Sequence, residues 1–65
     1  MWELLRTDGS VKCFQWMDEP EVIWVIKTGF TDQFIIVHED AYRLNFGKTE
    51  IHTAASLEEK YQIKF

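Results

Sequence analysis

Val22–Lys27 reads Val-Ile-Trp-Val-Ile-Lys, an apolar run that ends only at its last residue. Successive side chains of a β-strand point to opposite faces, and here both alternating sets are apolar. This pattern is typical of a central strand that is covered on both faces of its sheet. Phe34–His38 repeats the pattern, with Phe-Ile-Ile-Val before the histidine. The two stretches therefore predict the middle of a β-sheet.

Turn-forming residues separate further short strands on either side of this centre, at the spacing of a small all-β domain. Asp8-Gly9 predicts a hairpin, because glycine tolerates the positive φ that a tight turn requires. Pro20 interrupts the chain before the central strand, since proline lacks the N–H group that a ladder needs. Glu39-Asp40 and Gly47-Lys48 predict two more turns. The predicted strands are Met1–Arg6, Val11–Met17, Val22–Lys27, Phe34–His38, Tyr42–Phe46 and Thr49–Thr53.

The last part of the chain changes character. Ser56-Leu57-Glu58-Glu59 matches a capping box, in which the serine oxygen accepts from a backbone N–H three residues on and the last glutamate reaches back. Leu57 and Tyr61 are spaced to share one face of a helix. Because so short a helix is unstable alone, we expect a helix from Ser56 to about Tyr61 that docks on the sheet through these two side chains. The remaining residues to Phe65 predict a final short strand or a packed tail.

These elements predict one domain over residues 1–65, of mainly β (α+β) class. It has five to six short antiparallel strands and one short C-terminal helix. A single sheet covered on one face and a small SH3-like barrel both satisfy the pattern. A chain of this length buries only about 60% of the surface that its unfolded form exposes. The aromatic side chains, 15% of the residues, are therefore expected to supply much of the core.

The composition limits the compartment and the kinds of partner. The formal net charge of −4 argues against a nucleic-acid binder driven by phosphate contacts and against adsorption to an anionic membrane. No apolar run approaches the ~20 residues that cross a bilayer, and the first residues lack the basic start of a signal peptide. With only one cysteine present, these features predict a cytoplasmic protein, if Met1 is the true start.

Two arrangements could carry chemistry, and each has a simpler structural interpretation. Cys13 could act as a nucleophile with His38 or His52 as its base, but a buried free cysteine usually behaves as a small hydrophobe. His38-Glu39-Asp40 with His52 could bind a metal, but the spacing matches no metal signature, and histidine is ordinary at strand ends. We therefore expect no enzyme activity, no bound metal and no cofactor.

An interface on the outer surface is expected instead. Trp24 belongs to the central strand and is assigned to the core. The first hairpin brings the strands of Trp2 and Trp16 together, so the two rings could face each other, although the sequence does not fix the register. An exposed ring there would anchor a partner, whereas buried rings would help to fill the small core, which is the favoured interpretation for Trp16. Tyr42 belongs to a predicted edge strand, and this strand or the first one could pair with a partner or with a second copy. Acidic residues gather at the predicted turns, where they could meet a basic surface. The interface candidates are Trp2, Trp16, Asp18, Glu19, Glu21, Glu39, Asp40 and Tyr42.

The sequence thus predicts a small non-enzymatic protein-binding module, an inhibitor or adaptor that docks on a larger protein. Short acidic chains of this kind are often regulators encoded by phages or other mobile elements, an expectation that rests on general frequency and on no particular residue. Two alternatives stay open. One is an acidic mimic of nucleic acid that blocks a basic cleft, and the other is a nucleic-acid binder that stacks bases on an open sheet.

Overall fold

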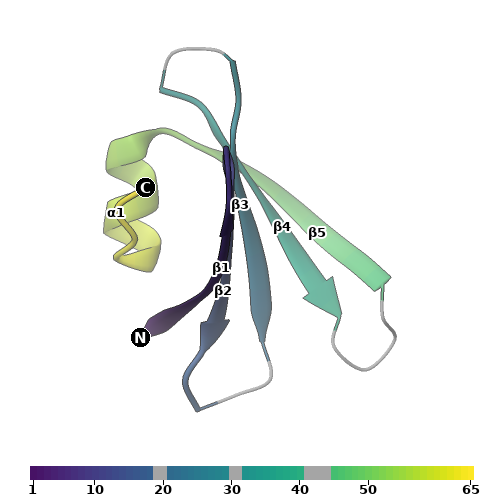
Figure 1. The fold of residues 1–65 in the computed structure, drawn as a ribbon. Coiled ribbons are helices and arrows are strands. Elements are labelled where there is room, and N and C mark those ends of the chain that lie inside the picture. The colour runs from purple at the N-terminus through teal and green to yellow at the C-terminus, as the bar shows by residue number, and fades with distance from the viewer. Residues whose placement is uncertain (19–20, 30–31, 41–44) are drawn as a thin grey trace.

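The computed structural model of the protein describes residues 1–18, 21–29, 32–40 and 45–65. Five strands form one antiparallel sheet in the order β1-β2-β3-β4-β5, and one helix follows the last strand (Figure 1). The elements are β1 (Trp2–Asp8), β2 (Val11–Trp16), β3 (Val22–Lys27), β4 (Phe34–Asp40), β5 (Asn45–His52) and α1 (Ala54–Tyr61). No helix in these parts of the chain is long and apolar enough to cross a membrane.

The predicted mainly β class with one short C-terminal helix is confirmed. Each strand pairs with its neighbours in the chain, and β1 and β5 form the two edges. Of the two predicted architectures, the open sheet is therefore the one observed. β3 has the predicted bounds and the predicted central position, and the Asp8-Gly9 hairpin joins β1 to β2 with Gly9 at a φ of 60°.

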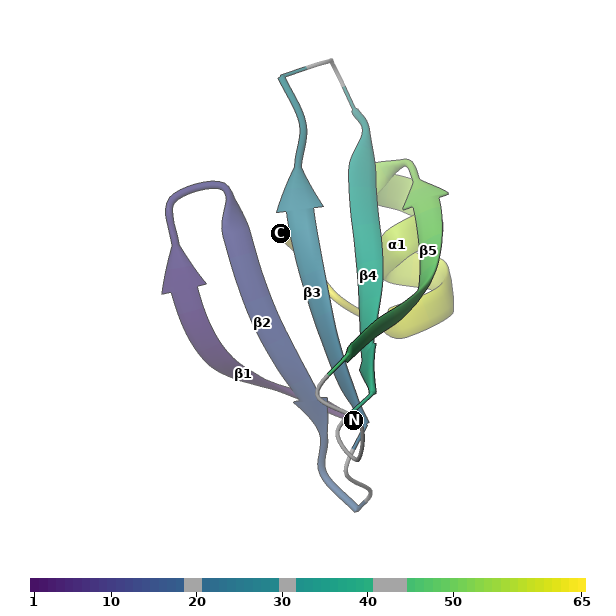
Figure 2. The same cartoon turned by 90° about the vertical axis from the view of Figure 1, so that its right-hand side faces the viewer.

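The core lies on one face of the sheet, between the sheet and the C-terminal segment. Figure 1 shows α1 on that side, and Figure 2 looks onto the opposite face with α1 behind the strands. The buried core residues are Phe14, Ile23, Val25, Phe34, Ile36, Leu57, Tyr61 and Ile63, with Trp2 and Phe65 packed against them. The last residues therefore form a packed tail. The Lys12 ammonium group donates to the Phe65 carbonyl at 3.3 Å and helps to hold it.

The helix docks as predicted but begins earlier than predicted. Thr53 is its N-cap, because the threonine hydroxyl accepts from the Ser56 backbone N–H at 3.1 Å. The predicted capping box that starts at Ser56 is wrong, since Ser56 lies inside the first turn. Gln62 ends the helix in the left-handed conformation, with its N–H donating to the Glu58 carbonyl at 2.7 Å.

Two of the predicted turns are wrong. Glu39-Asp40 continues β4, and Gly47-Lys48 lies within β5. These residue types are weak strand formers. Pairing of Glu39 with both β3 and β5 overrides its local preference, whereas Gly47-Lys48 lies at the register shift opposite His38, where a β-bulge accommodates an extra residue. β4 therefore ends at Asp40, and β5 begins at Asn45. The predicted strand Tyr42–Phe46 lies mostly outside the described residues.

Candidate functional site

The face of the sheet opposite α1 carries several rows of cross-strand neighbours. Two adjacent rows have an apolar centre, and the row beside them contains Glu3, Gln15, Val22 and Glu39. The first, here the Trp24 row, consists of Arg6, Cys13, Trp24, Val37 and Thr49. The second, the Ile26 row, consists of Asp8, Val11, Ile26, Ile35 and Ile51. Cross-strand neighbours of this kind lie ~4.5–5.5 Å apart and contact each other. The middle of both rows is apolar, and their charged members lie on the edge strand β1.

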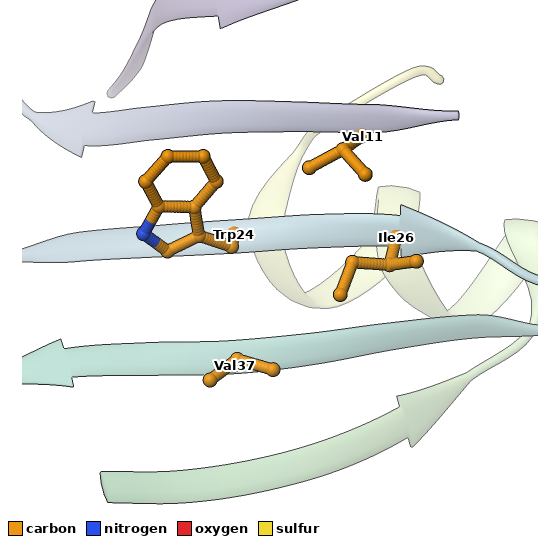
Figure 3. A pocket seen from close by; sticks show the side chains of 4 residues that line it. All are labelled: Val11, Trp24, Ile26 and Val37. Atoms are coloured by element: carbon orange, nitrogen blue, oxygen red, sulfur yellow. The ribbon is translucent and has the colours of Figure 1, made fainter. Parts of the chain in front are cut away.

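A hollow of about 300 Å³ lies at the centre of this face. Its lining consists of the half-buried side chains of Val11, Trp24, Ile26 and Val37, which come from β2, β3 and β4 (Figure 3). An apolar cavity of about 150 Å³ holds a benzene-sized group. The hollow is therefore large enough for an aromatic or branched side chain of a partner.

Trp24 occupies a different place from the one expected of it. Its ring is half-buried beside the hollow and does not belong to the core cluster, so its assignment to the core is wrong. The reason is that α1 packs on the other face, where its neighbours Ile23 and Val25 are fully buried. The Trp24 indole N–H is buried and has no hydrogen-bond partner in the described structure. A buried donor without a partner costs free energy.

Trp2 and Trp16 meet across the first hairpin, one of the arrangements that the sequence allowed. They are direct cross-strand partners, and their ring centroids lie 5.2 Å apart in an edge-to-face arrangement. Trp2 also contacts Tyr61 of α1, with centroids 5.7 Å apart. Edge-to-face aromatic pairs stabilise a fold beyond the area that they bury. Trp2 thus packs against the core from the side that carries α1, and the role of the two rings as interface anchors stays a prediction.

The predicted acidic candidates are not brought together on one face. The Glu21 carboxylate lies 3.8 Å from Nδ1 of His38, on the α1 side of the sheet. Glu39 follows His38 in β4, so its side chain points to the opposite face. Asp18 is exposed at the end of the first hairpin. Glu19, Tyr42 and the side chain of Asp40 lie outside the described residues.

A polar cluster that the sequence did not predict lies between β4, β5 and α1. Glu50 is its centre, and the exposed fraction of its side chain is only 12%. Its Oε2 accepts from the Tyr61 hydroxyl and from His38 Nε2, each at 2.6 Å. Its Oε1 accepts from Lys60 at 2.5 Å and from His52 Nε2 at 3.1 Å. Four donors from three elements therefore meet on one carboxylate.

These contacts shift the pKa values of Glu50 and Tyr61. Hydrogen bonds, above all from Lys60 and then from Tyr61, hold the pKa of Glu50 well below its usual range. Burial, followed by the contact with Glu50, raises the pKa of Tyr61 well above its usual range. At neutral pH the carboxylate is therefore ionised and the phenol is protonated. This is the arrangement that fixes α1 on the sheet.

Part of the cluster has the order serine, histidine, carboxylate. With its Nε2–H donating to Glu50, His52 presents Nδ1 as an acceptor to the Ser56 hydroxyl at 2.6 Å. The Ser56 backbone N–H, however, already donates to the Thr53 hydroxyl, so it offers nothing to an oxyanion. Lys60 also neutralises much of the carboxylate that would stabilise a protonated histidine. The arrangement serves the helix cap and the docking of α1.

Cys13 does not pair with a histidine. Its side chain is buried on the face opposite α1, whereas His38 and His52 bond to Glu50 on the α1 side. Burial raises the pKa of the Cys13 thiol, Glu39 adds to this effect, and Arg6 partly opposes it. The thiol is therefore neutral, and neither His38 nor His52 lies on its face of the sheet. Among the described residues, no three His, Cys, Asp or Glu side chains are grouped to hold a metal ion.

Comparison with models of protein families, with curated proteins and with solved structures finds no match to this chain.

Proposed function

We propose that this protein is a non-enzymatic protein-binding module that docks on an apolar surface of a larger protein, as an inhibitor or an adaptor. The observation that carries the proposal is the apolar centre of the Trp24 and Ile26 rows, with its hollow and with no described residue packed over it. Contiguous apolar patches larger than a few hundred Å² are rare on soluble monomers, and they mark interaction sites. A partner's aromatic or branched side chain fits the hollow.

The chemistry of this face favours a protein over a nucleic acid. Base stacking on a sheet works with several exposed rings and a positive groove. Among the described residues of the two rows, Trp24 supplies the single ring and Arg6 the single basic side chain. Mimicry of nucleic acid finds no support in the geometry either, because Glu21 and Glu39 point to opposite faces of the sheet.

Substitution of apolar residues on this face tests the proposal. Ile51 has an exposed fraction of 65% and lies at the edge of the Ile26 row, so Ile51→Lys should leave the fold intact. Leu4 is the matched control. It is 50% exposed on the other edge strand and pairs with the core residue Phe14, so it belongs to the α1 side of the sheet. Both substitutions change the net charge equally.

The assay is capture from host lysate with the wild-type protein, Ile51→Lys and Leu4→Lys as baits, followed by titration calorimetry with the purified partner. A partner of the proposed site binds the wild type and Leu4→Lys equally and binds Ile51→Lys at least ~10-fold more weakly, a difference of about 1.4 kcal/mol. Circular dichroism verifies that all three baits are folded. Equal affinity for all three baits would show that the partner uses another surface.

A further inference from the structure

We infer that a second copy of this chain occupies the uncovered face when no other partner does, in a two-fold symmetric dimer that packs sheet against sheet. This inference rests on the proposed function in one respect, that the uncovered face is a docking surface. It adds the identity of one occupant and the geometry with which it docks.

The face of the sheet opposite α1 has no covering layer among the described residues. The central strand is apolar on both faces, a pattern typical of strands that are covered on both sides. On the α1 side, Ile23 and Val25 have an exposed fraction of 0%, whereas Trp24 and Ile26 on the other side stay half-buried. Small chains with limited cores often gain stability by oligomerisation. A second sheet would supply the absent layer.

The uncovered face has the area that a small dimer interface needs. Five strands at ~4.8 Å spacing, each contributing about six residues at ~3.3 Å, give a flat footprint of roughly 480 Å² per copy. Two copies bury about 1,000 Å², which is the lower limit for a specific interface. The face is thus large enough for a dimer, and the dimer should be weak, with a dissociation constant in the micromolar range.

The uncovered face is also complementary to itself. A two-fold axis that runs across the strands, between the two rows, places the Trp24 row of one copy over the Ile26 row of the other. The Trp24 ring then lies over Ile26 and the hollow of the second copy. Such an isologous contact uses the same patch twice, and sheets pack face to face at a separation of ~10 Å.

The same axis also pairs the charges at the edge of the face. Arg6 belongs to the Trp24 row and Asp8 to the Ile26 row, so each Arg6 lies opposite Asp8 of the second copy. These two pairs offset part of the repulsion between chains that each carry a net charge of −4. The apolar centre adds no charge to that repulsion. The pattern therefore favours a second copy as occupant of this face.

Sedimentation and NMR test the dimer with the intact chain. Between about 1 µM and 1 mM, the range in which so small an interface half-associates, the weight-average mass of the wild type should rise from monomer to dimer. The indole N–H resonance of Trp24 should shift over the same range. Trp2 and Trp16 lie on the α1 side, so their indole resonances should stay constant and serve as internal controls.

Two sets of variants test the geometry. Val37→Lys and Ile51→Lys should weaken association at least ~10-fold, while Leu4→Lys leaves it unchanged. Because lysine lowers the net negative charge, general repulsion cannot cause that loss. Arg6→Asp alone and Asp8→Arg alone should each associate several-fold more weakly than the wild type, since each places like charges opposite each other. An equimolar mixture of these two variants should restore association.

A chain that stays monomeric to millimolar concentration would overturn the dimer, as would equal association of Ile51→Lys and the wild type. A mixture of Arg6→Asp and Asp8→Arg that fails to associate better than either variant alone would overturn the proposed axis. If the chain is monomeric and its captured partner still binds Ile51→Lys more weakly than Leu4→Lys, only the proposed dimer is wrong. If neither measurement distinguishes these two variants, the proposed function is wrong as well.

Discussion

The replacement of Glu50 by glutamine should remove most of the stability of this fold. Glu50→Gln keeps the shape of the side chain but exchanges one carboxylate oxygen for an NH₂ group. Each oxygen now accepts from two donors, so the new amide must face two donors whichever way it is turned. The less costly orientation points it at His52 and Lys60, which leaves the shorter contacts with Tyr61 and His38 in place.

The size of the effect follows from the burial of the donors that are lost. The Lys60 side chain is 51% exposed, so the loss of its ion pair costs only about 0–1 kcal/mol. The His52 side chain is 11% exposed, and the loss of a buried hydrogen bond to a charged group costs about 1.5–3 kcal/mol. The sum of roughly 2–4 kcal/mol is close to the ~3–5 kcal/mol that a single core of this size supplies.

Urea unfolding at pH 7, followed by circular dichroism, measures this difference. Glu58→Gln is the control, because Glu58 lies on the same helix, is 55% exposed and makes only a 3.7 Å contact with Lys64. We expect it to change the free energy of unfolding by less than ~0.5 kcal/mol. If Glu50→Gln were as stable as Glu58→Gln, the polar cluster would not be what holds α1 on the sheet.

Four further predictions concern buried groups and groups with shifted pKa values. The pKa of Glu50 is lower in the folded state than its ordinary value of 4.5, so its contribution is present above that pH and is lost as the pH falls below it. Urea midpoints should therefore drop on acidification, and less so in Glu50→Gln. The pKa of Tyr61 is raised from its ordinary value of 10.0, so the wild type should lose stability as the pH rises above 10, and Tyr61→Phe should lose less over the same range. Leu57→Ala should cost about 2–5 kcal/mol in the same urea assay, because Leu57 is 1% exposed in the core. Cys13 should react with iodoacetamide slowly in the folded chain and rapidly in urea, since burial shields the thiol and raises its pKa.

The strands with clear local signals were predictable from the sequence. Val22–Lys27 alternates two apolar sets and is bounded by turn residues, and the structure keeps these bounds. Asp8-Gly9 specifies a tight turn because of the φ that it requires, and that turn brings the strands of Trp2 and Trp16 side by side. The direct pairing of the two rings depends in addition on the β-bulge between Leu4 and Arg6, which the sequence did not predict. Leu57 and Tyr61 share a helix face by spacing alone, and both are buried.

The second half of the sheet was less predictable, because pairing across strands decides it. Nothing local in Asn45–His52 favours a strand through Gly47, and β5 forms because it pairs along β4. Glu50 has the same origin. In sequence it is an ordinary acidic residue on a short strand, and three of its four donors, Lys60, Tyr61 and His38, lie ten or more positions away. The position of Glu50 between His38 and His52 in the sequence was the one signal that could have indicated the polar cluster.

The sequence also predicted cover on both faces of β3, and the polar cluster explains why the described residues cover only one of them. Hydrophobic burial is non-directional, so an apolar helix face has little preference between two apolar faces of a sheet. A carboxylate that is taken out of water must be paired with donors. The helix therefore docks on the face of the sheet where it can supply those donors. Glu50 and both histidines lie on one face, and Lys60 and Tyr61 of α1 supply their partners there. The opposite face carries Thr49 and Ile51 of β5, and neither is a carboxylate that must be paired with donors. The same carboxylate that fixes α1 on one side therefore leaves the Trp24 and Ile26 rows free for a partner.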